Sequence, residues 1–175
     1  MNNATGTPES QHSASTAPSE TAPSAPTNAE LPAPAPWTEE DQQRWGSMLA
    51  GTLFERCEMR ILTLGPTGGT MTMPVEGNTQ PARLLHGGAS IALAESVASM
   101  AAVMQARSIY GEGAQAVGTS VTAHHHRSAR AGEVTATATA LHLGRRVATY
   151  LVNVHREDGV LLSTITVSTM LLPPA

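Results

Sequence analysis

The chain contains no lysine, so all ten of its basic residues are arginine. With fourteen acidic residues its formal net charge is −4, which gives no electrostatic basis for binding nucleic acid or an anionic membrane. Cys57 is the only cysteine, which excludes an intramolecular disulfide and fits a reducing compartment such as the cytoplasm. Aromatic residues make up only 3% of the sequence, so the core must be built from Ala, Val, Leu, Ile and Met. A length of 175 residues favours one folded domain.

Residues 1–36 contain no Lys or Arg and no apolar run, and they hold seven of the twelve prolines. A secretory signal peptide needs a basic start and an apolar run, so this segment is not typical of one. Its Ala, Pro, Ser and Thr composition cannot bury enough apolar surface to offset the entropy lost on ordering. We predict a disordered tail over residues 1–36, acting as a spacer or a docking segment, and one domain over residues 37–175.

The most apolar stretch follows the loop His86-Gly87-Gly88. Its apolar residues spread around the whole circumference of a predicted helix that ends near Arg107, which is typical of a helix buried on all sides. Glu95 is the single ionisable residue between Gly87 and Met104, and a lone carboxylate there needs a structural partner or a chemical role. The stretch is long enough to span a membrane. Its Ala, Ser and Gly content and the central Glu95 favour a core helix instead.

The rest of the chain is predicted to be mostly strand. A short helix over 38–49 begins at Thr38, which has the character of an N-cap. Strands at 55–64 and 70–75 flank the turn cluster 65–69 and form a hairpin. Four further strands are predicted at 117–126, 133–142, 146–156 and 160–172. Antiparallel pairing of about six strands around the long helix gives an α+β fold, in which a second subunit covers the remaining face of the helix.

Several groups of residues, in this order, carry a family resemblance: Gln80-Pro81, residues 84–96, His125 with Arg127-Ser128-Ala129-Arg130, and Leu141-His142-Leu143-Gly144-Arg145. Between Met48 and Leu172 the chain resembles hotdog-fold acyl-CoA thioesterases. It is most similar to the branch with an acid in the helix, which includes the Glu-type 4-hydroxybenzoyl-CoA, 1,4-dihydroxy-2-naphthoyl-CoA and enterobactin proofreading thioesterases. The resemblance implies a hotdog fold and a homodimer with shared active sites, often doubled to a tetramer.

Thioester hydrolysis needs a group that stabilises the carbonyl oxygen and a group that attacks or activates water. The backbone N–H of Gly87 lies at a predicted helix N-terminus, where unpaired donors and the helix dipole favour developing negative charge. Glu95 is the candidate nucleophile or general base, and the resemblance leaves both roles open. Ser99, one turn later, is a candidate to hold the hydrolytic water. Gln80 is a candidate to hydrogen-bond the thioester or that water, and His86 matches a position that supports the loop or contacts the acyl group.

Candidate substrate-binding residues follow the helix. Of the three histidines 124–126, His125 matches a family position near the acyl pocket. His124 and His126 share a strand face and could bind a metal, but no carboxylate or cysteine accompanies them at ligand spacing, so we expect no metal. Arginine side chains suit the phosphates of coenzyme A. The substrate-binding candidates are His125, Arg127, Ser128, Arg130, His142, Gly144 and Arg145.

These observations predict a cytoplasmic acyl-CoA thioesterase with no cofactor beyond the coenzyme A of its substrate. The resemblance favours an aromatic acyl group, with a medium-chain group as the alternative. Two other readings of the same residues are a non-catalytic acyl-CoA-binding hotdog protein and an acyl-thioester hydratase or dehydratase. Gly87 and Glu95 would lie roughly 12 Å apart on one straight helix at about 1.5 Å per residue. A shared site, with Gly87 from one subunit and Glu95 from the other, is therefore expected.

Overall fold

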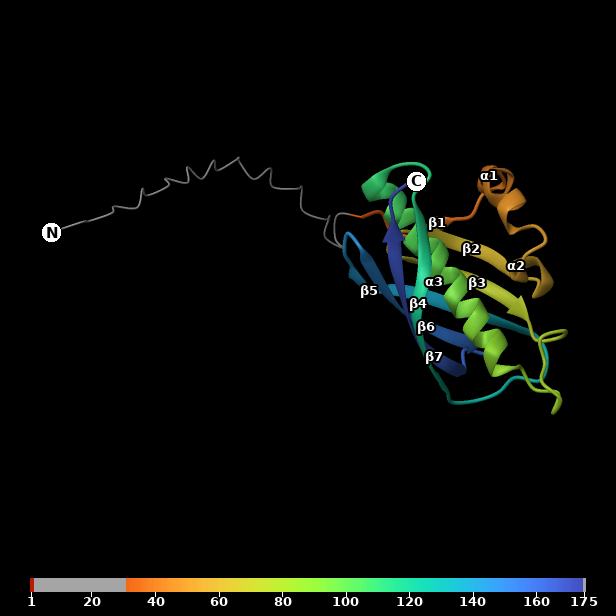
Figure 1. The fold of residues 1–175 in the computed structure, drawn as a ribbon. Coiled ribbons are helices and arrows are strands. Elements are labelled where there is room, and N and C mark those ends of the chain that lie inside the picture. The colour runs from red at the N-terminus through yellow and green to blue at the C-terminus, as the bar shows by residue number, and fades with distance from the viewer. Residues whose placement is uncertain (2–30, 175) are drawn as a thin grey trace.

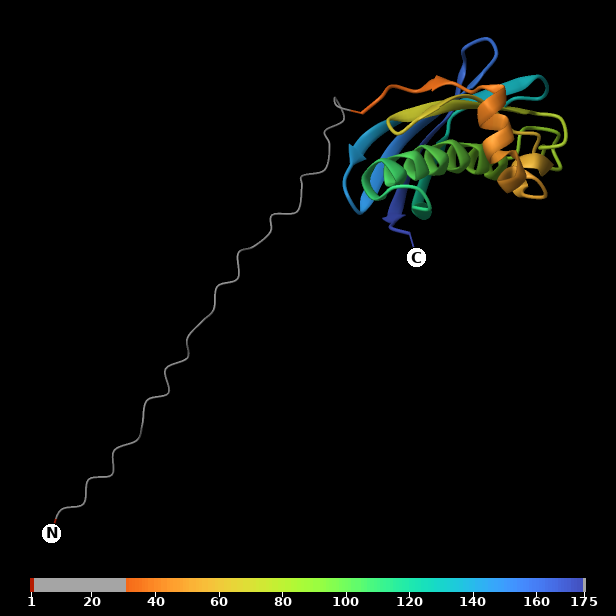
Figure 2. The same ribbon diagram turned by 90° about the horizontal axis from the view of Figure 1, so that it is seen from above.

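Helix α3, Gly87–Tyr110, lies along one face of an antiparallel sheet that curves around it (Figures 1 and 2). The computed structural model describes Met1 and residues 31–174. Within this part of the chain the sheet has seven strands in the order β1-β2-β3-β5-β6-β7-β4. The strands are β1 Ala35–Pro36, β2 Arg60–Gly65, β3 Gly68–Pro74, β4 Gln115–His125, β5 Glu133–Leu143, β6 Val147–Arg156 and β7 Leu161–Leu172. Two shorter helices, α1 Glu39–Leu49 and α2 Leu53–Arg56, precede β2. The predicted hotdog architecture is confirmed.

The side of α3 that faces the sheet forms the centre of the core. Leu93 and Val97 have no exposed surface, and neither do the small residues Ala94, Ala98, Ala101, Ala102 and Ala106. Fully burying one Leu or Val side chain contributes about 1.5–3 kcal/mol to folding. On the sheet, Tyr150 is also fully buried, and its hydroxyl donates a hydrogen bond to the carbonyl of Pro66 at 2.9 Å. Burial raises the pKa of Tyr150.

By length and composition alone, α3 could also cross a membrane. In the structure it packs against strands β2 to β7 on the inner face of the sheet. It is therefore the core helix of this fold, as the sequence predicts.

The strands alternate as expected for a sheet with one covered face. In β5, Val134 and Ala136 are buried beneath α3, whereas Thr137 is exposed on the opposite face. Thr137 pairs with Thr70 of β3 and Asn153 of β6, so polar side chains lie in register across the outer face. Most strands begin and end within about two residues of the predicted positions.

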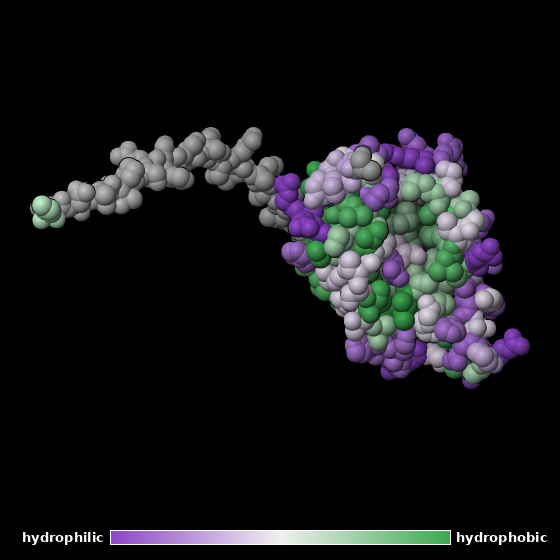
Figure 3. All heavy atoms as spheres, in the orientation of Figure 1, coloured by the Kyte–Doolittle hydropathy of each residue, from purple (hydrophilic) through white to green (hydrophobic). Residues whose placement is uncertain are grey.

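The described residues leave one face of α3 and one edge of the sheet uncovered. Ile91, Ala92, Met100 and Val103 on the helix are only half-buried. Apolar surface gathers on this face of the molecule in Figure 3, which has the orientation of Figure 1. The neighbouring strand β4 has eleven residues and, among the described strands, pairs only with β7. A long unpaired edge beside an apolar helix face is typical of a surface that another chain covers.

The prediction of a strand from residue 55 is wrong at its start. Thr52 accepts a hydrogen bond from the Phe54 N–H and begins helix α2, and the strand starts only at Arg60. The long helix also continues past the predicted end at Arg107 to Tyr110. It ends where Gly111 adopts a φ of 85°, which favours glycine.

The boundary placed at residue 36 also needs correction. Residues 35 and 36 form β1, paired with Leu64 and Thr63, so the sheet gains a seventh strand. The Thr67 hydroxyl donates to the carbonyl of Pro32 at 3.2 Å, and Leu31 packs against the core. The described end of the predicted tail is thus part of the domain. Residues 2–30 lie outside the described residues, and the disordered tail remains a prediction for them.

The start of α1 agrees with the sequence. Thr38 is its N-cap and forms a capping box with Asp41, in which each side chain accepts from the other residue's backbone N–H. The hydrogen bonds from Thr38 lower the pKa of Asp41. Trp45 is buried and lies 4.2 Å below the Arg107 guanidinium, whereas Met48, in the last turn of α1, is 52% exposed.

Two truncations test the role of β1. Deleting residues 2–36 removes the strand and the contacts of residues 31–34, so we expect the melting temperature to fall by several degrees, the shift that a loss of about 1 kcal/mol produces. Deleting only residues 2–30 keeps these contacts and should leave the melting temperature close to that of the full chain. Thermal unfolding followed by circular dichroism measures both. Equal melting temperatures for the two truncations would show that β1 adds no stability.

Candidate functional site

The N-terminus of α3 presents one free backbone donor. His86 is the N-cap, and its Nδ1 accepts a hydrogen bond from the Gly88 N–H at 2.8 Å. The Gly87 N–H makes no hydrogen bond to any residue that the structure describes. An unpaired N–H at the positive end of a 24-residue helix dipole favours a negatively charged oxygen. His86 therefore supports the loop, and Gly87 is left as the available donor.

The imidazole of His125 packs directly against Gly87. A Cβ atom at position 87 would stand 2.8 Å from Nε2 of His125, so only glycine fits here without moving the ring. The other ring nitrogen, Nδ1, lies 2.8 Å from the hydroxyl of Ser163, which is 1% exposed. Ser163 belongs to β7 and pairs with His125 across the β4–β7 ladder. The sheet thus places His125 beside the start of α3.

A small cavity of about 200 Å³ opens at this point. It is lined by Gln80, Leu85, Gly87, Ser90, His125, Arg127, Ser128 and Ser163. The structure therefore brings together five residues that the sequence analysis selected, from the loop before α3, from its first turn and from the end of β4.

Sequence reasoning missed Leu85, Ser90 and Ser163. Ser90 follows Gly87 by three residues, and helical spacing could have placed it on the same side of α3. Ser163 lies 38 residues beyond His125 in sequence, and only the strand register brings the two together.

Glu95 lies outside this cavity. It follows Gly87 by eight residues, a separation of about 12 Å along the helix axis. Its side chain is half-buried, and its carboxylate has no hydrogen-bond or ion-pair partner among the described residues. A Cβ atom at Gly118 of β4 would stand 2.5 Å from Oε1 of Glu95, so the carboxylate lies directly against the edge strand. Ser99, also half-buried, follows one turn later.

The remaining substrate-binding candidates are divided between the two ends of α3. Arg130 is exposed in the connection between β4 and β5, near the cavity end but not lining the cavity. The other three candidates lie at the opposite end of α3. His142 is the penultimate residue of β5, and Gly144 and Arg145 directly follow that strand. There the Tyr110 hydroxyl, at the C-terminal end of α3, donates to the carbonyl of Arg145 at 2.6 Å. One chain therefore does not bring these two groups of residues together.

The histidines 124–126 have separate surroundings. His126 Nε2 lies 3.1 Å from the Thr164 hydroxyl, and His124 is exposed. Across residues 31–174, no three His, Cys, Asp or Glu side chains are grouped so that they could hold a metal ion.

Comparison with known proteins gives the family. The model of the thioesterase superfamily matches residues 83–163. The proofreading thioesterase EntH of Cronobacter turicensis is 39% identical over 123 residues, which cover 70% of this chain and 87% of that protein. The 1,4-dihydroxy-2-naphthoyl-CoA hydrolase of Escherichia coli is 37% identical over 128 residues, covering 72% and 90%.

Solved structures agree with this result. A variant of the thioesterase PA1618 from Pseudomonas aeruginosa superposes with a TM-score of 0.69 at 30% identity, covering 79% of this chain and 99% of that one. The thioesterase HI1161 of Haemophilus influenzae gives a TM-score of 0.68 at 28% identity, covering 79% and 93%. These names favour hydrolysis over the hydratase and binding-only alternatives. The chain belongs to the thioesterase superfamily and is a thioester hydrolase with the hotdog fold.

Proposed function

We propose that the protein hydrolyses an acyl-CoA to the free acid and coenzyme A in the cytoplasm, without a metal or other cofactor. The observation that carries this proposal is the unpaired Gly87 N–H beside a cavity that Gln80, His125 and Arg127 also line. An aromatic acyl group is favoured because one relative is named a 1,4-dihydroxy-2-naphthoyl-CoA hydrolase. A medium-chain acyl group is the second candidate.

In the proposed reaction, the thioester carbonyl oxygen accepts a hydrogen bond from the Gly87 N–H, which stabilises the negative charge that forms there. Gln80, which lines the same cavity, donates a second hydrogen bond to the thioester or to the water. Glu95 attacks the carbonyl carbon itself, or takes a proton from a water that attacks it. Ser99 holds that water. Collapse of the tetrahedral intermediate breaks the C–S bond, and the coenzyme A thiolate leaves and takes up a proton. If Glu95 is the nucleophile, the acyl group remains on its carboxylate as an anhydride, and water then hydrolyses this bond to release the acid and restore Glu95.

Glu95 must then come from a second copy of the chain. About 12 Å separates Gly87 from Glu95 on one helix, so a single chain cannot place both at one carbonyl. We propose that two chains pair antiparallel through the free edge of β4, about a two-fold axis. Their α3 helices then lie side by side and antiparallel, and Gly87 of one chain faces Glu95 of its partner. The half-buried apolar face of α3 and the position of Glu95 against Gly118 of β4 support this pairing.

A row of apolar side chains supports the further pairing of two dimers into a tetramer. Val117, Met170 and Val147 pair in register across β4, β7 and β6 on the outer face of the sheet. They are 46%, 40% and 40% exposed. A contiguous exposed apolar row of this kind is typical of a protein–protein contact.

Coenzyme A is proposed to bind along the cavity mouth. Arg127 and Ser128 line the cavity, and Arg130 lies close to them in the chain, so these residues are placed to hold the phosphates. His142, Gly144 and Arg145 lie at the other end of α3. These three residues can contact the same substrate molecule as Arg127 only if another copy of the chain supplies them. Such surface contacts should affect KM more than kcat.

Replacement of the acid tests the mechanism. Glu95→Ala should lower kcat by roughly 10²- to 10⁴-fold with little change in KM, because the carboxylate acts in the transition state. Glu95→Asp should retain part of the activity. Free thiol released from benzoyl-CoA measures both, and the same assay with aromatic, medium-chain and carrier-protein thioesters identifies the acyl group. Near wild-type turnover by folded Glu95→Ala would exclude this mechanism.

Mixing two inactive variants tests the shared site. Gln80→Ala and Glu95→Ala are refolded separately and as an equal mixture. Random pairing makes about half of the dimers mixed, and each mixed dimer has one intact and one doubly altered site, so activity should recover to roughly a quarter of wild type. Subunit exchange is verified with a tag on one variant. If exchange occurs and activity stays at the average of the two variants, each site is built from one chain.

The contact between Glu95 and the edge strand gives a further test. In Gly118→Ala the new methyl group would meet Oε1 of Glu95 at 2.5 Å, and the flexible carboxylate must move. We expect a lower kcat with a melting temperature close to wild type. Unchanged kcat in the folded variant would mean that the observed position of the carboxylate does not matter for turnover.

A further inference from the structure

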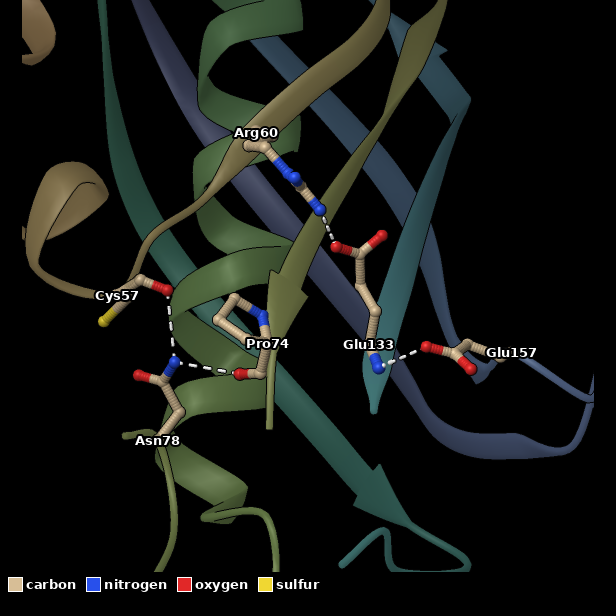
Figure 4. A network of polar contacts seen from close by, with 6 residues as sticks. All are labelled: Cys57, Arg60, Pro74, Asn78, Glu133 and Glu157. Atoms are coloured by element: carbon tan, nitrogen blue, oxygen red, sulfur yellow. Dashed lines mark hydrogen bonds and ion pairs between the residues drawn. The ribbon is translucent and has the colours of Figure 1, made fainter. Parts of the chain in front are cut away.

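The loop between β3 and α3 is anchored by Asn78. The side-chain nitrogen of Asn78 donates to the carbonyl of Pro74 at 2.9 Å and to the carbonyl of Cys57 at 3.1 Å. Figure 4 shows the amide between these two groups, next to the end of β3. The backbone carbonyl of Asn78 accepts the His86 N–H at 2.9 Å. One residue thus joins the end of β3, the C-cap of α2 and the residue that caps α3.

Most other hydrogen bonds of this loop are internal or come from its backbone. The Gln80 N–H donates to the Leu84 carbonyl at 2.8 Å, which closes the loop on itself without positioning it on the domain. The Leu85 N–H donates to the Ala129 carbonyl at 2.8 Å. Within residues 78–85, Asn78 is the one residue whose side chain forms a hydrogen bond to the rest of the described chain. Among the polar side chains of this loop, the amide of Asn78 is therefore the one that fixes its position on the domain.

The chemistry of asparagine suits this place. Its NH₂ group has two donors, which match the two carbonyls. The Cys57 carbonyl lies at the end of α2, where helix carbonyls have no partner within the helix. Leucine has nearly the same size and no donor, and glutamine keeps the donors on a longer side chain.

We propose that Asn78 is a positioning residue for thioester hydrolysis. It fixes the loop so that Gln80 and the Gly87 N–H face the thioester together, and it acts through His86, the residue directly before Gly87. This inference rests on the proposed role of Gly87. A displacement of about 1 Å at a reacting group can lower a rate by about 100-fold, so a fixed loop matters for kcat even where it matters little for folding.

Three variants test the proposal in the full-length protein. Asn78→Leu should lower kcat about 10- to 100-fold while KM stays within about threefold, because binding groups remain and transition-state contacts are lost. Asn78→Gln should recover part of this loss. Thr79→Val is the control, since the hydroxyl of this neighbouring loop residue makes no hydrogen bond in the described chain, and its kcat should stay within about twofold of wild type. Circular dichroism and melting temperature verify the fold, and Asn78→Ala replaces Asn78→Leu if the latter does not fold.

The outcomes are distinct. A kcat for folded Asn78→Leu within about twofold of wild type overturns the proposal, as does Asn78→Gln that is no more active than Asn78→Leu. If Asn78→Leu has a lower melting temperature but its folded fraction has wild-type kcat, Asn78 contributes to stability alone. This result would also overturn the proposal. Glu95→Ala is assayed in parallel. If Glu95→Ala is inactive and Asn78→Leu is fully active, only the role of Asn78 is lost, whereas an active Glu95→Ala removes the proposed mechanism itself.

Discussion

The burial of α3 against the inner face of the sheet is the contact on which the rest of the structure depends. Leu93, Val97 and the alanines around them have no exposed surface. Strands β2 to β7 all contact this helix. Alanine brings the helix close to the strands, which compensates for a chain with few aromatic residues to fill a core. The positions of Gly87, Glu95 and Ser99 follow from where this helix begins and which way it runs.

The helix contributes to the site in two different ways. At its start, the His86 side chain uses the Gly88 N–H and leaves the Gly87 N–H free, so capping selects a single donor from the first turn. Farther along, Glu95 faces the edge strand β4, away from the cavity. The separation of eight residues, about 12 Å along the helix axis, then prevents both groups from meeting at one carbonyl within one chain. This distance is the physical basis for our proposal that two chains form each site.

Polar side-chain contacts hold the loops and strands around α3 in place. Asn78 ties the loop before α3 to β3 and α2, and Ser163 holds the ring of His125 beside Gly87. Arg60 pairs with Glu133 nearby, and the Glu157 carboxylate accepts the Glu133 N–H at 2.7 Å (Figure 4). These polar contacts join strands that are distant in sequence. They fix the end of the sheet at which the candidate site lies.

Gln80 and His125 were selected through the family resemblance. The sequence by itself determined the long helix, the alternating strands, the Thr38 cap and the choice of Gly87 as a donor at a helix N-terminus. Each of these depends on local patterns: apolar periodicity, capping chemistry and short motifs. Tertiary structure decided the features that depend on pairing between distant segments. Strand β1 forms because residues 35 and 36 meet β2, which no tail composition could indicate. Ser163 joins the cavity because β7 lies beside β4, and the Glu95 carboxylate lies against Gly118 because β4 runs along that side of α3.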